Sequence, residues 1–502
     1  MSLFDLFSSI SLLGSLLVAI SLWTVVGILR RAYFSPLSNI PGPGLAALTP
    51  LYEFYFDVIR QGQYTWQIAK LHEQYGPIIR ISPYEVHIND PEFIDEVYRG
   101  NSEKWKPAAE IFGTGKSVFG TVPHELHRIR RAPLNGYFSK QAVNRLAPVI
   151  QSSIEALCKR MSEAKSSGQP FELGIAYIGL TVDIITEYSF AEPYGCLKRE
   201  DLGKEWYDMM TEATKIVPLS FQSGWVMKTL EAMPVSMVKV MNPQLMCMID
   251  YQSDIEQRLR KLKDVNERSK TTIFQSLLNG DLPPQEKEIP RLVDEGMGLV
   301  AAGANTTAHT LKYVTFQLLN NPDILHKLME ELVDAIPDPS VIPPVSSLEQ
   351  LPYLSAIIQE ALRTANSVPH RLQRVSTNST VRYRGYDIPP GTPVGMSPTL
   401  IHENADLFPN PKTFKPERWL DADGKRTVEL TRYLMPFGRG TRQCIGMNLA
   451  WAELYMTLGT VFRRFDMKLY QTNLEDVEVV HDFFNGLPKD GAKGLRVLIA
   501  QK

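Results

Sequence analysis

The sequence contains one glycine-rich loop that runs directly into a helical pattern, Phe437-Gly438-Arg439-Gly440-Thr441-Arg442-Gln443-Cys444-Ile445-Gly446. The predicted helix begins at Met447, so Cys444 lies just before a helix N-terminus, with Arg442 two residues earlier. Both features create a positive potential, which lowers the pKa of a thiol and favours the thiolate. The glycines let backbone N–H groups approach the sulfur, and Phe437 can cover it. The loop therefore suits a thiolate that ligates iron, and a buried structural cysteine is the alternative.

The spacing of this loop, F-x-x-G-x-R-x-C-x-G, resembles the haem-binding signature of the cytochrome P450 family at all five fixed positions. The resemblance implies that the cofactor is haem b and that Cys444 is the axial ligand of its iron. Phe437 and Gly446 would belong to the haem-binding loop, and Arg442 would pair with a haem propionate. An axial thiolate pushes electron density toward the iron and favours cleavage of the O–O bond.

Two further segments resemble the same family in the expected order. Glu360-Ala361-Leu362-Arg363 matches the helical E-x-x-R motif, and Pro416-Glu417-Arg418-Trp419 matches the P-E-R-F/W segment that follows it. The spacing i, i+3 places Glu360 and Arg363 on one face of a helix. The resemblance implies that Glu360, Arg363 and Arg418 form a buried ion network that holds the loop presenting the cysteine.

Three more residues resemble the groups that hold haem propionates in this family. Arg371-Leu372-Gln373-Arg374 is similar to the strand whose last arginine, Arg374, meets a propionate. His127 and Arg131 are similar to a helical pair, one turn apart, that also binds the propionates. A metal-ligating role for His127 is the competing interpretation, but no partner histidine lies nearby at the spacing of a zinc site.

The long apolar segment around residue 300 contains Ala302-Gly303-Ala304-Asn305-Thr306-Thr307, which resembles the A/G-G-x-D/E-T-T/S motif of the family. A glycine in mid-helix costs about 1 kcal/mol, and in the family a local opening of the helix beside the iron explains it. Thr306 would help deliver protons there. Asn305 stands where the family usually carries an acid, and an amide cannot cycle a proton. Thr306 and Asn305 are the predicted catalytic residues.

The N-terminus contains an uncharged, mostly apolar run from Leu6 to Leu29, between Asp5 and the pair Arg30-Arg31. As a helix it would cover roughly 36 Å, enough to cross a hydrocarbon core of about 30 Å. The charge order is the reverse of a signal peptide, and the positive-inside rule leaves the rest of the chain in the cytosol. We therefore predict a transmembrane anchor at 1–31 (span 6–29), a Pro/Gly-rich hinge at 32–50, and a catalytic domain at 51–502.

Length and composition describe a large globular protein of 502 residues that is 44% hydrophobic. A net charge of −2 excludes a global field for nucleic acid, and four scattered cysteines exclude a disulfide framework. Helical patterns such as Pro322–Ala335 and Met447–Arg464 dominate, while Ile78–Ile81 and Val381–Ile388 read as short strands. The sequence predicts a mainly α fold with a minor β-sheet, the cytochrome P450 fold, as a single large domain.

The resemblance implies a haem-thiolate monooxygenase that inserts one oxygen atom from O₂ into an apolar small molecule. Electrons would come from NADPH through a separate NADPH–cytochrome P450 reductase, because the chain has no nucleotide-binding G-x-G-x-x-G after a strand. The basic run Arg128-Ile129-Arg130-Arg131 could meet an acidic reductase, and a solvated helix face is the alternative. The expected location is the endoplasmic reticulum membrane, with lipid around a single-pass anchor.

Two other functions stay open at this point. Asn305 leaves room for an isomerase or dehydratase of the same fold that works without a reductase, and a non-catalytic haem-binding protein is the third reading. The hinge and motifs look most like fungal membrane-bound enzymes of secondary metabolism, and the segment His481–Phe484 is similar to enzymes that oxidise terpenoids.

The region from Met209 to Met248 holds eight of the 17 methionines, and flexible thioethers suit an adaptable apolar pocket. By resemblance this region caps the substrate pocket. The other pocket candidates are all apolar: Val118, Phe119, Met297, Ala301, Val368 and Phe483. We therefore expect a neutral, apolar substrate such as a terpenoid or another secondary-metabolite scaffold.

Overall fold

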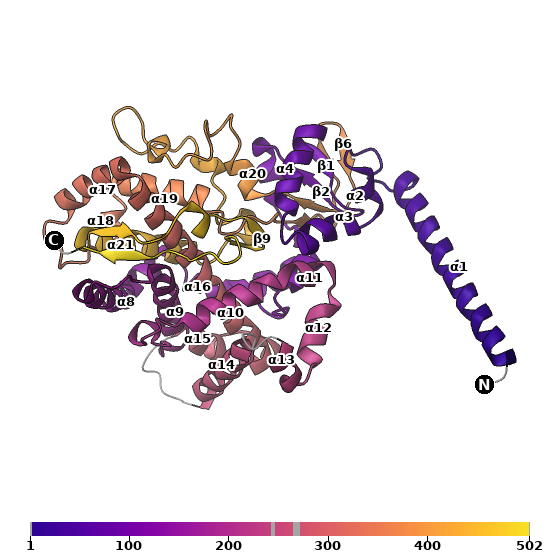
Figure 1. Cartoon of the computed structure of the whole chain (residues 1–502), viewed down its shortest axis with the longest axis horizontal. Helices are drawn as coiled ribbons and strands as arrows, with labels where there is room; N and C mark the ends of the chain where they lie inside the picture. The colour runs from indigo at the N-terminus through magenta and orange to yellow at the C-terminus, as the bar shows by residue number, and fades with distance from the viewer. Residues whose placement is uncertain (1–2, 242–245, 265–271, 501–502) are drawn as a thin grey trace.

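The computed structural model describes residues 3–241, 246–264 and 272–500. One long helix, α1 (Leu3–Tyr33), stands away from a body in which helices surround several small sheets (Figure 1). The predicted fold class, mainly α with minor β structure in one large body after an N-terminal helix, is confirmed.

The centre of the body is the long helix α16 (Ile289–Asn320), which packs against α9 (Leu173–Phe190) and α14 (Met246–Asp264). Helix α9 is apolar enough to cross a membrane, yet 78% of it is buried inside the body. A helix that is hydrophobic on all sides belongs in a core. Helices α8 (Lys140–Ser167) and α21 (Met447–Arg464) complete this core.

Helix α21 and helix α17 begin and end where the sequence predicts them. The sequence did not predict the helices between 204 and 241, and the first of them, α10, contributes to the cap over the cavity described below. The remaining helices are α2 (Gly44–Leu48), α3 (Leu51–Phe54), α4 (Tyr64–Tyr75), α5 (Ile94–Tyr98), α6 (Lys106–Glu110), α7 (His124–Asn135), α10 (Lys204–Lys215), α11 (Val217–Gln222), α12 (Trp225–Ala232), α13 (Val235–Met241), α15 (Ile273–Asn279), α17 (Pro322–Ala335), α18 (Val345–Leu348), α19 (Pro352–Thr364) and α20 (Pro398–His402).

The main sheet joins two distant parts of the chain. Its five strands lie in the order β1 (Ile78–Arg80), β2 (Val86–Ile88), β7 (Pro393–Gly395), β4 (Arg374–Val375) and β3 (Glu103–Lys104). Only β2 and β7 are parallel. Because Lys104 pairs with Arg374 in the β3–β4 register, two cations come together at one sheet edge.

Three two-stranded ribbons complete the β structure. They pair β5 (Val381–Tyr383) with β6 (Tyr386–Ile388), β8 (Met467–Leu469) with β11 (Val497–Ile499), and β9 (His481–Phe483) with β10 (Asn485–Leu487).

The stretch 32–50, expected as a spacer, is packed onto the main sheet. Leu37 and Ile40 are buried in a small core with β1 and β2, and the Arg80 N–H donates to the Pro41 carbonyl at 2.7 Å. Gly42 lies so close to β1 that a Cβ there would meet the Arg80 carbonyl at 2.4 Å. The prolines therefore stiffen a segment that fixes α1 to the body rather than separating the two.

A buried ion network surrounds the carboxylate of Glu360 on α19. Arg363 donates to both carboxylate oxygens at 2.7 and 2.9 Å, and Arg418 Nε donates at 3.3 Å. The indole of Trp419 adds a hydrogen bond of 3.0 Å. The side chains of Glu360 and Arg363 are 0% and 1% exposed. The structure thus brings together the three residues expected to form this network.

A chain of hydrogen bonds connects this network to the cysteine loop. Arg363 Nη1 donates to the carbonyl of His402 at 2.7 Å, and the ring Nε2 of His402 accepts the Met435 N–H at 2.8 Å. Burial, reinforced by Arg363, lowers the pKa of His402 to about 3, so the ring is neutral and can accept. Two residues after Met435, the Phe437 carbonyl accepts the Cys444 N–H at 2.8 Å.

Replacing Arg363 with alanine should strand the buried carboxylate of Glu360 and lower the free energy of unfolding by about 3–5 kcal/mol. Urea unfolding of the purified protein measures this loss. Lys204→Ala is the matched control, because Lys204 forms an exposed ion pair with Asp208 and such pairs contribute about 0–1 kcal/mol. Equal losses in the two variants would contradict a structural role for the Glu360 network.

Candidate active site

A cavity of about 410 Å³ lies in the middle of the body, between α16, the cysteine loop and the cap formed by α10 and α14. Cys444 faces this cavity, and its exposed surface is cavity surface. Strand β4, the turn at Phe484 and the loop before α7 close the remaining sides. Residues from six distant parts of the chain therefore share one chamber.

The cysteine loop keeps its shape because two of its glycines have no room for a side chain or adopt a left-handed backbone. Gly440 has φ +72°, and a Cβ there would lie 1.9 Å from the Tyr98 carbonyl. Gly438 has φ +65° and lies against Leu372. Both positions bring the loop onto α5 and the segment before β4, and the chain then enters α21 directly after Gly446.

The electrostatics at Cys444 differ from the sequence-based expectation. Burial raises the pKa of the Cys444 thiol, while the Gly446 N–H and the guanidinium of Arg131 oppose this rise. The cation that acts on the sulfur is therefore Arg131 of α7, not Arg442, and the helix N-terminus does not lower the pKa on balance. In a buried site the positive charge of a bound iron would itself favour the thiolate.

Five basic side chains line the cavity beside Cys444. They come from β3, α7, β4 and the cysteine loop: Lys104, His127, Arg131, Arg374 and Arg442. Arg442 donates to the carbonyls of Thr121 and Val122, the latter at 2.7 Å, and its Nε has no hydrogen-bond partner among the described residues. Burial and the neighbouring cation Arg374 lower the pKa of Arg442 to about 10 and that of Lys104 well below its usual range.

This basic cluster lacks its own counter-ions. Within the described part of the chain, no carboxylate forms an ion pair with Lys104, Arg131, Arg374 or Arg442. Buried charges need partners, so the cluster requires an anionic ligand next to the cysteine. The two propionates of haem meet that requirement, and burial keeps His127 neutral by lowering its pKa to about 3, so its ring N–H can donate to a carboxylate.

Helix α16 passes the cavity as a continuous helix, without the local opening that was expected at Gly303. The glycine has a packing reason, because a Cβ there would lie 3.0 Å from Ile185 of α9. Thr306 lines the cavity and its hydroxyl donates to the Ala302 carbonyl at 3.0 Å. Asn305 is not among the residues that line the cavity. Of the two predicted catalytic residues, the structure brings only Thr306 to the site.

Five of the six predicted pocket residues line the cavity: Val118, Phe119, Met297, Ala301 and Val368. Phe483 does not, because it ends β9 and the chain turns at the next residue, whose backbone is left-handed (φ +73°). Its ring stacks on His481 at a centroid distance of 5.4 Å, and the next residue, Phe484, faces the cavity.

Within the methionine-rich cap, Met209, Met210 and Met248 reach the cavity. Residues 242–245 of this segment lie outside the described residues.

Sequence reasoning missed three charged residues of the site, Lys104, Glu453 and Glu295, and the last is described below. Lys104 precedes Trp105 in an unremarkable segment, and only its pairing with Arg374 brings it to the cavity. Glu453 of α21 is 2% exposed, lines the cavity and bonds to Thr307, and burial raises its pKa to about 8. An acid on the buried face of an apolar helix was the available signal for Glu453.

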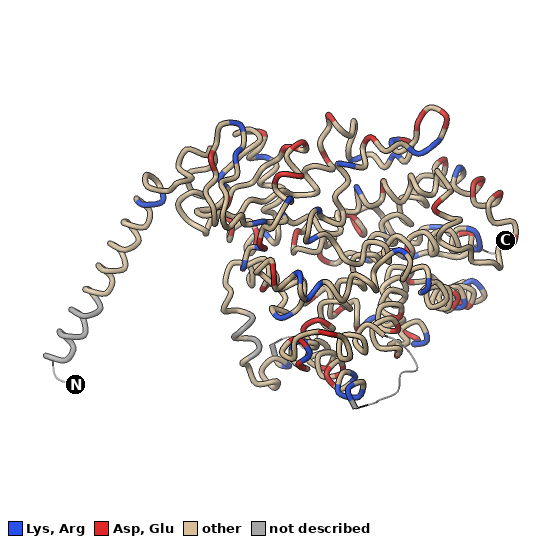
Figure 2. The backbone as a smooth tube through the Cα atoms, turned by 180° about the vertical axis from the view of Figure 1, so that it is seen from behind, with Lys and Arg blue, Asp and Glu red and all other residues tan. Residues whose placement is uncertain are grey.

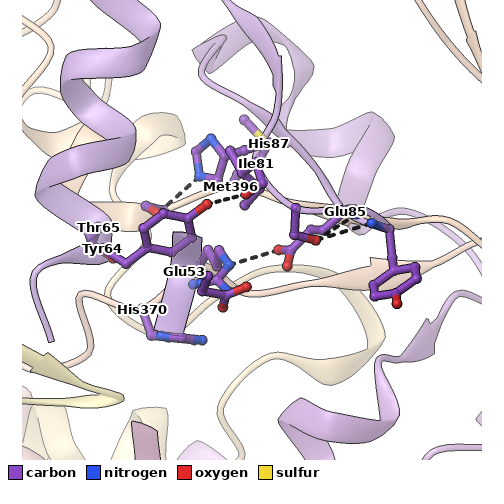
Figure 3. A network of polar contacts seen from close by, with 12 residues as sticks. Glu53, Tyr64, Thr65, Ile81, Glu85, His87, His370 and Met396 are labelled. Carbon is purple, nitrogen blue, oxygen red and sulfur yellow. Dashed lines mark hydrogen bonds and ion pairs between the residues drawn. The ribbon is translucent and has the colours of Figure 1, made fainter. Parts of the chain in front are cut away.

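Arg371 lies near the cavity but is held by its own partners. Its guanidinium donates to Glu85 at 2.9 Å and to Glu53, two carboxylates that Figure 3 shows converging in one network. The rings of Tyr64 and Phe221 lie 5.2 and 5.1 Å from its guanidinium carbon. These contacts fix the segment before β4 to the N-terminal part of the body.

Arg130 belongs to the interior, against the expectation that it contributes to a basic docking surface. Its guanidinium binds Glu286 with two hydrogen bonds of 2.7 and 3.1 Å, and the residue is 9% exposed. Arg128 is on the surface and pairs with Glu125. The basic run therefore divides between a solvated face, a buried ion pair and, at Arg131, the cavity.

Comparison with known proteins places the site in context. Residues 43–485 match the family model described as Cytochrome P450. The chain is 42% identical to a tryptophan 6-hydroxylase of Fusarium equiseti, with 94% of each chain covered. It is 39% identical to an N-acetyltryptophan 6-hydroxylase of Emericella nidulans (99% of each covered), and 42% identical to a cytochrome P450 monooxygenase of Ascocoryne sarcoides (94% and 95%).

The match covers the cavity, the buried cations and the cysteine loop, and the relatives carry the names of hydroxylases and monooxygenases. A cavity with one cysteine and a cluster of cations without counter-ions is what a haem-thiolate enzyme needs. The chain belongs to the cytochrome P450 family, as a monooxygenase that uses haem b.

Proposed function

We propose that this monooxygenase hydroxylates the aromatic ring of a small, indole-type precursor of a fungal secondary metabolite. Two relatives that match over almost the whole chain are named for hydroxylation of tryptophan and of N-acetyltryptophan. Those names describe the relatives, and the cavity of this chain supplies the independent support. An aromatic substrate replaces the terpenoid favoured by the sequence, and the experiment below compares the two.

The observation that carries this proposal is an aromatic wall on the substrate side of the cavity. Phe112, Phe119 and Phe484 all line the cavity, and their ring centroids lie 5.4 to 5.7 Å apart. Two of the three contacts are edge-to-face, at 86°. Such an arrangement accepts a further flat ring at favourable offset or edge-to-face geometry. A planar indole fits this wall better than a puckered terpenoid skeleton.

The chain's own residues have defined roles in this reaction. Bound haem would supply the oxygen-activating chemistry, and Cys444 would ligate its iron. Lys104, Arg374 and Arg442 would neutralise the propionates, and Arg131 would keep positive potential near the sulfur. Thr306 places a hydroxyl on the cavity wall, where it can hold a water molecule or pass a proton.

Asn305 does not line the cavity. Its amide is therefore no argument for an isomerase that works without a reductase, and oxygen insertion remains the proposed reaction. Hydroxylase and monooxygenase names among the relatives support the same choice.

A redox partner must deliver electrons, and we propose an NADPH–cytochrome P450 reductase on the endoplasmic reticulum membrane. Between Asp5 and Arg30 helix α1 carries no charged residue, and its Gly14–Tyr33 segment is long and apolar enough to span a membrane (Figure 2). Helices α2, α3, α11 and α12 lie on the same side of the body as α1 (Figure 1). They expose apolar side chains there: Leu45, Leu51, Trp225 and Leu219. This face would rest on the lipid surface.

Cys444→Ser should abolish the thiolate-specific Soret band of the reduced carbon monoxide complex, because a serine alkoxide is far less available at neutral pH than a thiolate. Absorption spectroscopy of the purified protein measures this band. Cys158→Ser and Cys196→Ser are the controls, since both cysteines are buried away from the cavity. A variant that retained the band would remove Cys444 from the site.

Reconstitution with a reductase tests the substrate class. Incubation with NADPH should convert indole or N-acetyltryptophan to products that are one oxygen atom heavier, and mass spectrometry detects them. Phe119→Ala should raise KM for these substrates about tenfold, because about 1.4 kcal/mol of ring contact corresponds to that factor. Turnover of a terpenoid hydrocarbon without turnover of any indole would overturn the proposal.

Deleting residues 1–30 should release part of the protein from membranes and leave the haem content unchanged. The truncation retains Arg31, whose Nη1 donates to the Leu48 carbonyl at 2.9 Å. Residual binding to vesicles should fall further with Trp225→Ser in the truncated protein, because Trp225 is 66% exposed on the same side. Loss of haem on truncation would contradict an anchor that is independent of the catalytic body.

A further inference from the structure

One wall of the cavity is a compact loop, residues 114–121, between α6 and α7. Ser117 Oγ donates to the Thr114 carbonyl at 2.7 Å, and Thr121 Oγ1 donates to the Ser117 carbonyl at 2.6 Å. A Cβ at Gly120 would lie 2.2 Å from the Thr114 carbonyl, so only glycine allows this fold. Four members of the loop line the cavity: Thr114, Ser117, Val118 and Phe119. These internal hydrogen bonds and the close approach at Gly120 hold residues 114–121 together as one compact unit.

Two neighbouring carboxylates of α16 hold this loop by its backbone. The Val118 N–H donates to Glu295 Oε2 at 3.1 Å, and the Lys116 N–H donates to Asp294 Oδ2 at 2.9 Å. Glu295 is 2% exposed and itself lines the cavity. It lies two residues before Met297, so the same turn of helix supplies both the tether of the loop and a further lining residue of the cavity.

Glu295 is in turn part of a buried network of two cations and two carboxylates. Arg291 Nη2 lies 2.8 Å from Glu295 Oε2, and Arg291 Nε donates to Glu286 at 3.1 Å. Arg130 binds the same Glu286 and also donates to Thr121 Oγ1 at 2.8 Å. The charges balance, as buried groups require. Both the middle and the end of the 114–121 loop are thus tied to one network.

We propose that Glu295 is a positioning residue for substrate selectivity, which acts by fixing the 114–121 loop so that Val118 and Phe119 form a preformed wall. The inference rests on the proposed function in that it assigns this wall to the substrate. Without the carboxylate, the Val118 N–H would be buried and unpaired, an arrangement that costs enough free energy to displace the loop. Phe119 would then leave its contacts with Phe112 and Phe484.

Two azoles separate the wall from the iron site in the haem-loaded full-length protein. Imidazole ligates the iron and is too small to reach the wall, whereas 4-phenylimidazole ligates it and extends a ring into the cavity. Glu295→Ala should weaken 4-phenylimidazole about tenfold, the effect of losing one buried hydrogen bond that holds the wall. Imidazole affinity should change less than about threefold. Spectral titration of the ferric protein gives both dissociation constants.

Amide hydrogen exchange directly measures the protection of the Val118 N–H, which donates to Glu295. Exchange in the peptide that covers residues 114–121 should accelerate in Glu295→Ala and return toward the wild-type rate in Glu295→Gln, whose amide oxygen can still accept the Val118 N–H. The matched control is Glu331→Ala, which removes a carboxylate that accepts the Tyr353 and Leu354 N–H groups at 2.8 Å, remote from the cavity. It should leave both azole affinities and exchange at 114–121 unchanged.

Three outcomes overturn the inference: no change in either azole, equal weakening of both, or the same effect in Glu331→Ala. If Glu295→Ala yields no haem-loaded protein, Asp294→Ala removes the other tether from a less buried position and carries the same comparison. The ratio of the two azole dissociation constants does not depend on the natural substrate. The expected change in this ratio can therefore be absent although the enzyme hydroxylates indoles, and it can be present although the enzyme does not.

Discussion

The buried carboxylate of Glu360 is the interaction on which the rest of the site depends. Four donors converge on it, from Arg363, Arg418, Trp419 and the Lys415 backbone. A charge with no solvent contact is tolerated only when its partners are complete, so these elements have one mutual arrangement. Through Arg363, His402 and Met435 that arrangement fixes the start of the cysteine loop.

The capacity to bind haem follows from a cluster of positive charges beside Cys444. Around the cavity, the protein brings together cations from four elements, and no carboxylate among the described residues forms an ion pair with Lys104, Arg131, Arg374 or Arg442. Their mutual repulsion and desolvation lower the pKa values of Lys104 and Arg442. A dianionic ligand relieves both costs at once. Cations and carboxylates are equal in number around Glu286 and Glu295, whereas the cations beside Cys444 have no carboxylate ion-pair partner among the described residues.

The substrate side of the cavity depends on different physics. Its walls include the aromatic rings of Phe112, Phe119 and Phe484 and several thioethers, and the loop that carries Phe119 is held by backbone tethers such as the Val118 N–H to Glu295. Ring–ring contacts would set the orientation of an aromatic substrate, while the ion network of Glu295 and Arg291 holds the loop that forms the wall.

The sequence by itself determined those features that depend on local spacing. The loop from Phe437 to Gly446, the i, i+3 pair Glu360 and Arg363, and helices such as α17 and α21 needed only periodicity and turn chemistry. These signals are local because a helix face, a glycine turn and a cysteine just before a helix N-terminus are each built from residues a few positions apart.

Only the tertiary structure decided what depends on contacts between distant segments. Strand pairing brought Lys104 beside Arg374, and the left-handed turn between β9 and β10 placed Phe484 rather than Phe483 at the cavity. Packing against Ile185, not an opened helix, explained Gly303, and desolvation outweighed the helix N-terminus at Cys444. Arg130 moved from a supposed surface to a buried ion pair. In each case the free energy of burying a side chain decides the outcome, and burial depends on which residues, remote in the sequence, cover that position.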